Sequence, residues 1–274
     1  MNETRSWDEL SRHYHDEVIS PFAPGVRFPL RSDLRARVTG WKRDGVAGDR
    51  VVLDCGCGIG EALVEVAGQV GLAAGIDFSE GMLTESEARL STLGIEAHLR
   101  MGERALSALR QALEALESGS RRTFLVRGDL NRLGAVAARA HLTLAINSIV
   151  PATEPEARHM FQEVAATVRP EGELIAVFPS RDSLVYLRGL FEESGDDFGS
   201  VGSLEEKTGE FRNCEGELQW FLSEEEIRRY CDEAELIPER LEKIEYPWRM
   251  LRESGWGYFP GQPEVWDWYL VARR

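Results

Sequence analysis

Short, continuous apolar runs alternate along the chain with longer segments whose apolar residues recur three and four positions apart. The runs predict buried strands at 51–54, 72–77, 123–127, 142–147 and 173–178. The segments between them predict helices at 61–70, 79–93 and 154–168. Strands that alternate with helices indicate an α/β fold with a doubly wound, mostly parallel sheet and helices on both faces.

The two ends of the chain predict elements outside this alternation. Helical spacing of apolar residues predicts helices over 6–19 and 30–41, separated by a break rich in proline at 20–25. Ser223 and Glu226 have the spacing of a capping box and predict a helix that ends near 234. Two strands should follow it, at 238–246 and 266–272.

Two stretches are too long to be simple connections. The first, 94–122, predicts a strand at 95–100 and a helix at 103–116. The second, 180–217, is rich in glycine, serine and aspartate, and we expect a partly flexible lid because long loops are often functional. A turn is expected at 170–172. We therefore predict one domain over 1–274, divided into a helical cap (1–48), a core (49–180), a lid (181–222) and a C-terminal part (223–274).

Charge and cysteine content narrow the class of protein. The 274 residues include 32 Lys and Arg against 47 Asp and Glu, a net charge of −15 that disfavours binding to nucleic acid. Four cysteines lack the spacing of a metal or redox motif, so we expect reduced thiols, no metal and a cytoplasmic location without a leader segment. No apolar run approaches the roughly 18 residues of a membrane span, so no membrane partner is expected.

The most informative stretch is the glycine-rich turn Asp54-Cys55-Gly56-Cys57-Gly58-Ile59-Gly60-Glu61. Glycines after a buried strand let the backbone approach a ligand closely, and a following helix offers free N–H groups. A dinucleotide fingerprint would place its third glycine where Glu61 stands. Because a carboxylate there would repel a pyrophosphate, the turn favours an adenosyl amino acid over NAD.

Asp77 ends the next predicted strand, within the usual distance of an acid that binds a ribose. Its carboxylate could accept hydrogen bonds from both ribose hydroxyls. The alternative interpretation is an acid at the start of a helix, without contact to a ligand.

Residues 51–61 resemble the first motif of the class I S-adenosylmethionine (SAM)-dependent methyltransferases. The resemblance continues at 75–79 with Met82, at 127–130, at 145–149 and at 168–174, and is weaker at 223–237 and in the last strand. It implies a Rossmann-like fold, SAM as the cofactor and S-adenosylhomocysteine (SAH) as its product. It says little about the substrate.

The resemblance also implies roles for particular residues. The methionine part of SAM would contact Asp54, Gly56, Gly58 and Gly60. Asp77 would bind the ribose, and the adenine would contact Phe78, Met82, Asp129 and the Leu130 N–H group. Glu103 is an alternative to Asp129, which we favour because 124–126 is the more apolar strand. Asn147 stands where many relatives carry an acid, and Glu171 stands in place of a common glycine.

Methyl transfer needs alignment of the nucleophile and the methyl group, and a base only where the nucleophile must lose a proton. Asn147 would open onto the transfer site, and Tyr14 resembles a tyrosine over the methyl end of the cofactor. With His13 these residues are the candidate catalytic groups. His13 and His15 flank Tyr14, so at most one points inward with it, and both have exposure to solvent as the alternative.

Tyr246 and Trp248 are candidate substrate contacts, because they lie between a strand and a loop. Trp266 and Trp268 share one face of the last strand and are expected to pack in the core, although a wall for a cationic amine is possible. We therefore predict methylation of a small molecule on O, N, S or C, by a monomer or a homodimer. The rivals are a SAM-binding protein without catalysis and an NAD(P)-dependent oxidoreductase.

Overall fold

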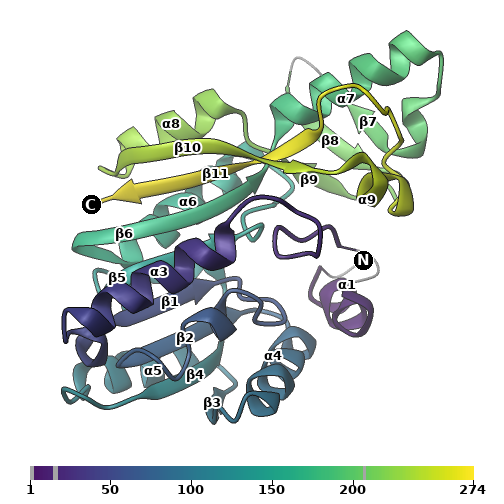
Figure 1. Cartoon of the computed structure of the whole chain (residues 1–274). Coiled ribbons are helices and arrows are strands. Elements are labelled where there is room, and N and C mark those ends of the chain that lie inside the picture. Colours follow the sequence, from purple (N-terminus) through teal and green to yellow (C-terminus); the bar gives the residue numbers. More distant parts are fainter. Residues whose placement is uncertain (1–2, 15–17, 206–207) are drawn as a thin grey trace.

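The computed structural model describes residues 3–14, 18–205 and 208–274, and its centre is an eight-stranded sheet (Figure 1). The strand order is β10-β11-β6-β5-β1-β2-β4-β3. The strands are β1 Val51–Cys55, β2 Leu72–Asp77, β3 Ala97–Arg100, β4 Arg122–Arg127, β5 Ala140–Ile146, β6 Val168–Pro179, β10 Ile237–Tyr246 and β11 Val265–Arg273. The pairings of β11 with β10 and with β6 are antiparallel and the other pairings are parallel, which confirms the predicted mostly parallel sheet.

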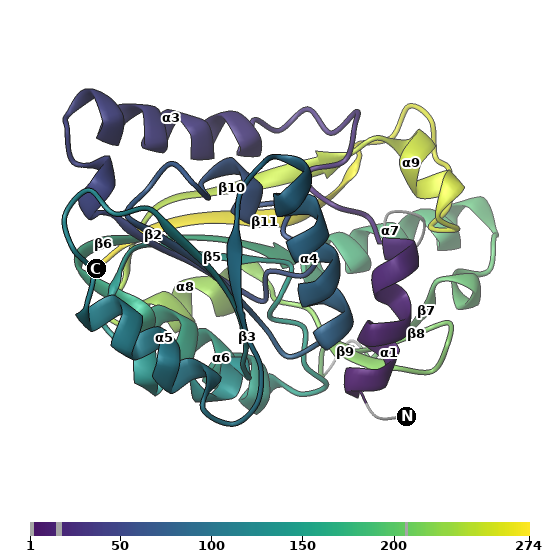
Figure 2. The same ribbon diagram turned by 90° about the horizontal axis from the view of Figure 1, so that it is seen from below.

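Helices cover both faces of the sheet (Figure 2). The helices α3 Leu30–Arg43 and α4 Glu80–Thr92 pack on one face, and α5 Ala105–Glu114, α6 Glu154–Thr167 and α8 Glu224–Glu233 pack on the other. Successive strand residues alternate between these layers: Val52 joins the first core and Leu53 the second. The strand β1 lies between β5 and β2, and the strand order reverses at β1. In sheets of this kind, ligands bind at this position, beyond the carboxyl ends of the strands.

The N-terminal segment docks on the start of α4. The helix α1 Glu3–Leu10 becomes a 3₁₀ turn at Ser11–His13, so the continuous helix expected over 6–19 is wrong; the Ser11 hydroxyl bonds back to the Asp8 carbonyl at 2.9 Å. Asp8 accepts hydrogen bonds from the Ser79 hydroxyl (2.6 Å) and the Gly81 N–H group (2.9 Å). His15 lies outside the described residues.

The helix predicted at 61–70 is wrong. A 3₁₀ helix, Leu63–Glu65, stands there between turns. Gly60 and Gly68 both have left-handed backbones, with φ of +79° and +69°, and Val66 departs from helical values with φ of −123°, so no regular α-helix forms over 61–70. The glycine-rich turn is therefore not followed by an α-helix whose N-terminal dipole could act on a ligand.

The long stretch at 94–122 adds an edge strand and a helix to the sheet. β3 lies at the edge and pairs only with β4, so β4 takes the place next to β2. The expected turn at 170–172 is wrong, because these residues belong to β6. Glu171 has φ of +63°, where glycine is more usual, and its N–H group donates to the Arg274 carbonyl at 2.9 Å.

The predicted lid is ordered structure over the described residues. It contains α7 Arg181–Ser194, a 3₁₀ turn at Phe198–Ser200 and a small antiparallel sheet of β7 Gly202–Leu204, β8 Glu210–Asn213 and β9 Leu218–Trp220. This region and α9 Trp248–Glu253 lie beyond the carboxyl ends of the main strands (Figure 1). Its apolar residues, such as Phe191 and Phe211, are buried, so the stretch is not a loose loop.

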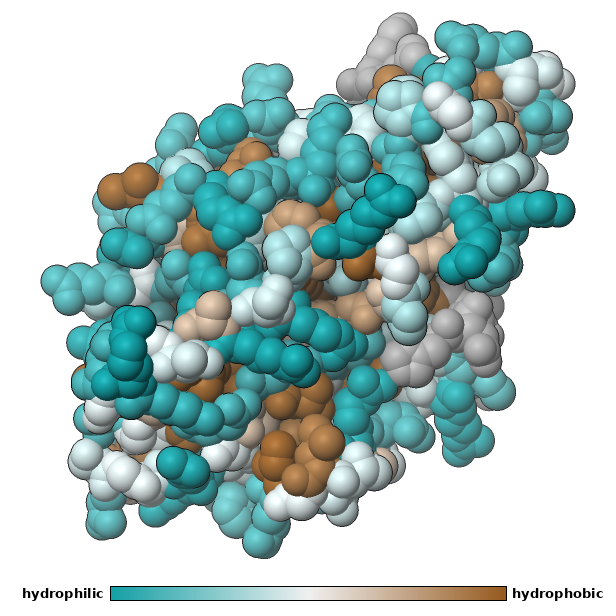
Figure 3. Space-filling model, viewed as in Figure 1, coloured by the Kyte–Doolittle hydropathy of each residue, from teal (hydrophilic) through white to brown (hydrophobic). Residues whose placement is uncertain are grey.

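The surface of the face seen in Figure 3 is mainly hydrophilic, and its apolar atoms occur in separate small areas. Among the described helices, none combines the length and the apolar character needed to cross a membrane.

Candidate functional site

The glycine-rich turn holds three residues in left-handed backbone conformations, with φ of +72° at Gly56, +50° at Gly58 and +79° at Gly60. A Cβ atom on Gly56 would lie 2.3 Å from the Ser148 Cβ atom, and one on Gly60 would lie 2.4 Å from the Ser86 Oγ atom. Glycine is therefore required at two of these positions by packing as well as by conformation.

Asp77 holds this turn in place. Its Oδ2 atom accepts a hydrogen bond from the Gly58 N–H group at 2.8 Å, and its Oδ1 atom accepts one from the Ser79 N–H group at 2.9 Å. Burial raises the pKa of this carboxyl group to about 6. The predicted ribose ligand is thus also a structural support of the turn, and each oxygen retains a lone pair for a ligand.

Asp54, at the end of β1, is 1% exposed. Its Oδ2 atom has no hydrogen-bond partner among the described residues. Burial, and then the charge of Asp77, raises the pKa of Asp54 to about 7. Asp54 and Asp77 take part in none of the ion pairs of the described residues. Two buried acids therefore lie close together without a cation that neutralises them.

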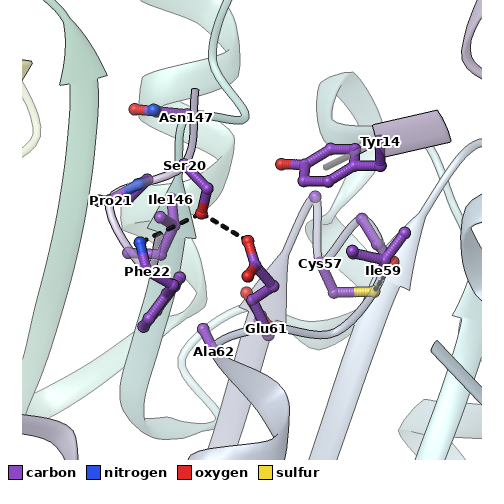
Figure 4. A pocket seen from close by; sticks show the side chains of 13 residues that line it. Tyr14, Ser20, Pro21, Phe22, Cys57, Ile59, Glu61, Ala62, Ile146 and Asn147 are labelled. Carbon is purple, nitrogen blue, oxygen red and sulfur yellow. Dashed lines mark hydrogen bonds between the residues drawn. The ribbon is translucent and has the colours of Figure 1, made fainter. Parts of the chain in front are cut away.

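A cavity opens at the carboxyl ends of β1 and β5, and its empty space of about 360 Å³ includes the part that is open to solvent. Its lining residues are Tyr14, Ser20, Pro21, Phe22, Asp54, Gly56, Cys57, Gly58, Ile59, Glu61, Ala62, Ile146 and Asn147. The Tyr14 hydroxyl points into the space that Ser20, Glu61 and Asn147 border from other sides (Figure 4). Burial and the charge of Glu61 raise the pKa of Tyr14.

Residues 18–29, here called the strap, close one side of the cavity. The Ser20 hydroxyl donates to the Glu61 carboxylate at 2.5 Å, and the Phe22 N–H group donates to the Ser20 hydroxyl at 3.1 Å (Figure 4). Arg31 anchors the end of the strap by donating to the Phe22 carbonyl at 3.1 Å and to Glu65 at 2.7 Å. Sequence reasoning treated the strap only as a break between helices; its one signal was Phe22 between two prolines.

A second polar cluster lies at the ends of β5, β10 and β11. Asp267 Oδ2 accepts hydrogen bonds from the Tyr246 hydroxyl at 2.5 Å and from Asn147 Nδ2 at 3.0 Å. Burial raises the pKa of Asp267 to about 6. Sequence reasoning missed Asp267, although it was a lone acid in the apolar run 265–272.

Of the predicted catalytic residues, Tyr14 and Asn147 line the cavity, whereas His13 is exposed and does not. Neither predicted substrate contact is in the lining: Tyr246 is buried and bonds to Asp267, and Trp248 is buried with its Nε1 atom donating to the Gln262 carbonyl at 2.9 Å. No group of three metal-ligating side chains occurs within the described ranges.

The residues expected near adenine lie around the end of β2. Phe78 is half-buried, and Met82 is 1% exposed. The Gly128 N–H group donates to the Asp77 carbonyl at 2.9 Å, which brings the turn with Asp129 and Leu130 next to Asp77. Asp129 is exposed and caps a 3₁₀ turn. Glu103 follows β3, one strand further away.

The chain has the fold of the class I SAM-dependent methyltransferases. A SAM-dependent methyltransferase from Methanosarcina mazei shares 15% identity and a TM-score of 0.51 over 82% of this chain and 92% of its own. Magnesium protoporphyrin IX methyltransferase from Synechocystis PCC 6803, with bound SAH, is 19% identical in sequence and has a TM-score of 0.52. The match covers 98% of this chain and 94% of the methyltransferase. The (4+2)-cyclase SpnF is 15% identical in sequence and has a TM-score of 0.58, over 99% of this chain and 94% of the cyclase. In sequence, no family model and no curated protein matches.

Proposed function

We propose that the cavity binds SAM and that the chain transfers its methyl group to a small molecule. The observation that carries this proposal is the pair of buried carboxylates, Asp54 and Asp77, whose charges no described cation neutralises. Two such acids oppose a pyrophosphate and attract a ligand with a sulfonium and an ammonium group. The solved methyltransferases of the same fold support the same cofactor.

The described residues fit this ligand at several atoms. The unpartnered Oδ2 atom of Asp54 can accept a hydrogen bond from the ammonium group, and the remaining lone pairs of Asp77 can accept from ribose hydroxyls. Phe78, Met82, Asp129 and Leu130 are proposed to surround the adenine. SAM would supply an activated methyl group on a positively charged sulfur, which needs no metal.

The chain's own contribution would be to bind the two reactants, align them and exclude water. Tyr14 and the strap cover the cavity, and Asn147 faces it from the end of β5. Alignment of this kind lowers the activation free energy by up to about 7–11 kcal/mol in favourable cases. We propose Tyr14 as a contact of the methyl end, and Tyr246 and Trp248 as residues of the acceptor region.

The remaining expectations join this proposal: a single domain, a reducing cytoplasmic location, and action as a monomer or homodimer on a small molecule rather than on nucleic acid. The four cysteines are free thiols, which fits a reducing compartment. The likeness to a cyclase is a reason to test turnover and not binding alone, because one fold hosts several reactions.

Calorimetric titration of the purified chain with SAM, SAH, NAD and NADP tests the proposal. We expect micromolar binding of SAM and SAH and none of the nicotinamide cofactors. Binding of NAD or NADP alone would overturn the cofactor assignment. Formation of SAH from SAM with an extract of small metabolites would then separate an enzyme from a protein that only binds the cofactor.

A further inference from the structure

Three basic side chains lie at the amino end of the sheet, opposite the cavity. Arg50 precedes β1, His141 is the second residue of β5 and Arg169 is the second residue of β6, and these strands are neighbours. Although the chain has a net charge of −15, neither arginine forms an ion pair with an acid among the described residues. Arg50 lies over the Trp41 ring, 5.7 Å from its centroid, and its buried Nε atom has no hydrogen-bond partner within the described ranges.

An irregularity in the sheet accompanies the contact between His141 and Arg169. The pairing of β6 with β5 changes register on passing His141, so that β6 contains extra residues opposite that position. Bulges of this kind aim a side chain in a direction that a regular strand would not allow. The Arg169 Nη1 atom lies 2.7 Å from the His141 Nε2 atom.

The ring of His141 cannot satisfy both of its contacts. Its Nδ1 atom accepts a hydrogen bond from the Val51 N–H group at 3.1 Å, so the neutral imidazole carries its hydrogen on Nε2. The Arg169 guanidinium has only donors, and therefore two N–H donors face each other. An acceptor that binds to both groups removes this conflict, and an anion does so best because its hydrogen bonds are charge-assisted.

The charges around His141 also favour an anion. Burial lowers the pKa of its imidazole to about 4, and the charges of Arg169 and Arg50 act in the same direction, whereas Asp49 opposes them. The imidazole is therefore neutral near pH 7 and donates through Nε2. Asp49 is exposed, and its carboxylate accepts a hydrogen bond from the Ser118 hydroxyl at 2.6 Å, so this single acid does not balance two arginines.

We propose that His141 and Arg169, with the charge of Arg50 close by, form a binding site for a tetrahedral oxyanion of the phosphate or sulfate type. Its several oxygens can accept from the Nε2–H group and from the guanidinium at once, and Arg169 is exposed, so the ion can enter from solvent. The cavity lies at the other end of the strands, so this inference does not depend on the proposed function. An ion that binds only the folded chain would stabilise it.

The first test is the ionisation of His141, followed by NMR of the ¹⁵N-labelled chain, with His141→Gln to assign its signals. In sodium chloride we expect the Nε2–H tautomer and a pKa well below the ordinary value for histidine. In sodium sulfate of equal ionic strength, the pKa should rise by about 1–3 pH units, because a bound anion favours the imidazolium. An Nδ1–H tautomer, or equal pKa values in the two salts, overturns the inference.

The second test is calorimetric titration with sulfate of the wild type and of Arg169→Met. We expect saturable binding to the wild type and about tenfold weaker binding to the variant, as for the loss of a charge-assisted hydrogen bond. Arg110→Met removes the same charge from an exposed position on α5 and should bind as the wild type does. Equal affinity in Arg169→Met, or the same loss in Arg110→Met, contradicts the site. If Arg169→Met does not fold, the NMR comparison on the wild type decides.

The source of the anion is identified by titration with inorganic phosphate and with methyl phosphate. Binding of both supports a site that accepts the phosphoryl group of a larger molecule. Binding of inorganic phosphate alone supports a site for the free ion. If sulfate, phosphate and methyl phosphate all fail to bind, the inference is wrong.

Discussion

The two sides of the cavity are built by different means. The side at the ends of β1 and β2 consists of backbone and two acids within one local segment, Asp54 to Asp77, tied together by the bonds from Gly58 and Ser79 to Asp77. The other side consists of side chains from segments far apart in sequence, such as Tyr14, Ser20 and Asn147, and Asp267 bonds to Asn147 from outside the lining. The first side has excess negative charge on buried groups, whereas the second has a hydrogen-bond network around one acid.

This difference separates two functions. A rigid turn with fixed charges suits a cofactor, which is the same in every reaction. Side chains that come from several elements can be substituted without altering the sheet, so they suit an acceptor that differs between proteins. Changes on the first side should therefore affect cofactor affinity. Changes on the second should affect the choice of acceptor and leave the cofactor bound.

Among variants that leave the support of the glycine-rich turn intact, the largest effect is expected from Asp54→Asn. Loss of a charged hydrogen bond costs about 1.5–3 kcal/mol, so SAM affinity measured by calorimetry should fall about 10- to 150-fold. The chain without ligand should become more stable at pH 8, because the pKa shift from 3.8 to about 7 reflects a cost of ionisation of up to about 4 kcal/mol. Asp232→Asn is the control, with neither change. Unaltered SAM affinity would remove Asp54 from the site.

Asp54 isolates the effect of charge better than Asp77 does, because Asp77 also supports the glycine-rich turn. Asp77→Ala should abolish SAM binding, but it leaves the N–H groups of Gly58 and Ser79 without their acceptor. Loss of binding there would combine two causes.

A smaller effect is expected from pH. Asp54 must be ionised to bind a cation, and its pKa without ligand is about 7. SAM affinity should therefore fall about tenfold between pH 8 and pH 6. The stability of the free chain should move the other way: a folded-state pKa above 3.8 means that stability decreases as pH rises toward and through 7. Asp54→Asn should lose both dependences, and a flat affinity profile in the wild type would contradict the role of its charge.

The smallest effect on the cofactor is expected from Gly81→Ala, which acts from outside both sides by displacing the N-terminal segment that leads into Tyr14. The new Cβ atom would lie 2.9 Å from the Asp8 carbonyl oxygen and 3.0 Å from its Cα atom, so α1 must move away from α4. We expect about threefold weaker SAM binding, because Tyr14 follows α1, and faster proteolysis near the N-terminus. Gly189→Ala in α7 is the control, since its Cβ atom meets nothing within 4 Å. Equal proteolysis of the two variants would show that this contact does not hold α1.

The sequence predicted best what local chemistry determines. The central strands are continuous apolar runs, and the glycine-rich turn needs residues with left-handed backbones, so both were visible without the fold. The helix expected at 61–70 failed because Gly60 and Gly68 interrupt the helical pattern, which periodicity alone does not register. The helix and strands inside 180–217 were not predicted, because the short strands pair only with one another in a small separate sheet.

The same reasoning explains which site residues were found. Asp54 and the glycines share one local motif, whereas Asp267 lies 120 positions from the Asn147 that it contacts. Ser20 likewise meets Glu61 across 41 positions. No spacing rule joins such residues. The available signal was the unusual presence of an acid in an apolar strand, which suggests burial with a purpose but does not name its partner.

The mutual repulsion of Asp54 and Asp77 has a consequence for the abundance of the protein in a living cell. A ligand that binds only the folded chain stabilises it by an amount that grows with ligand concentration. Here the ligand would also relieve a charge that the empty chain must carry. A cell short of this cofactor would hold more of the protein in open, protease-sensitive states, so the lifetime of the chain would rise and fall with the supply of its proposed cofactor.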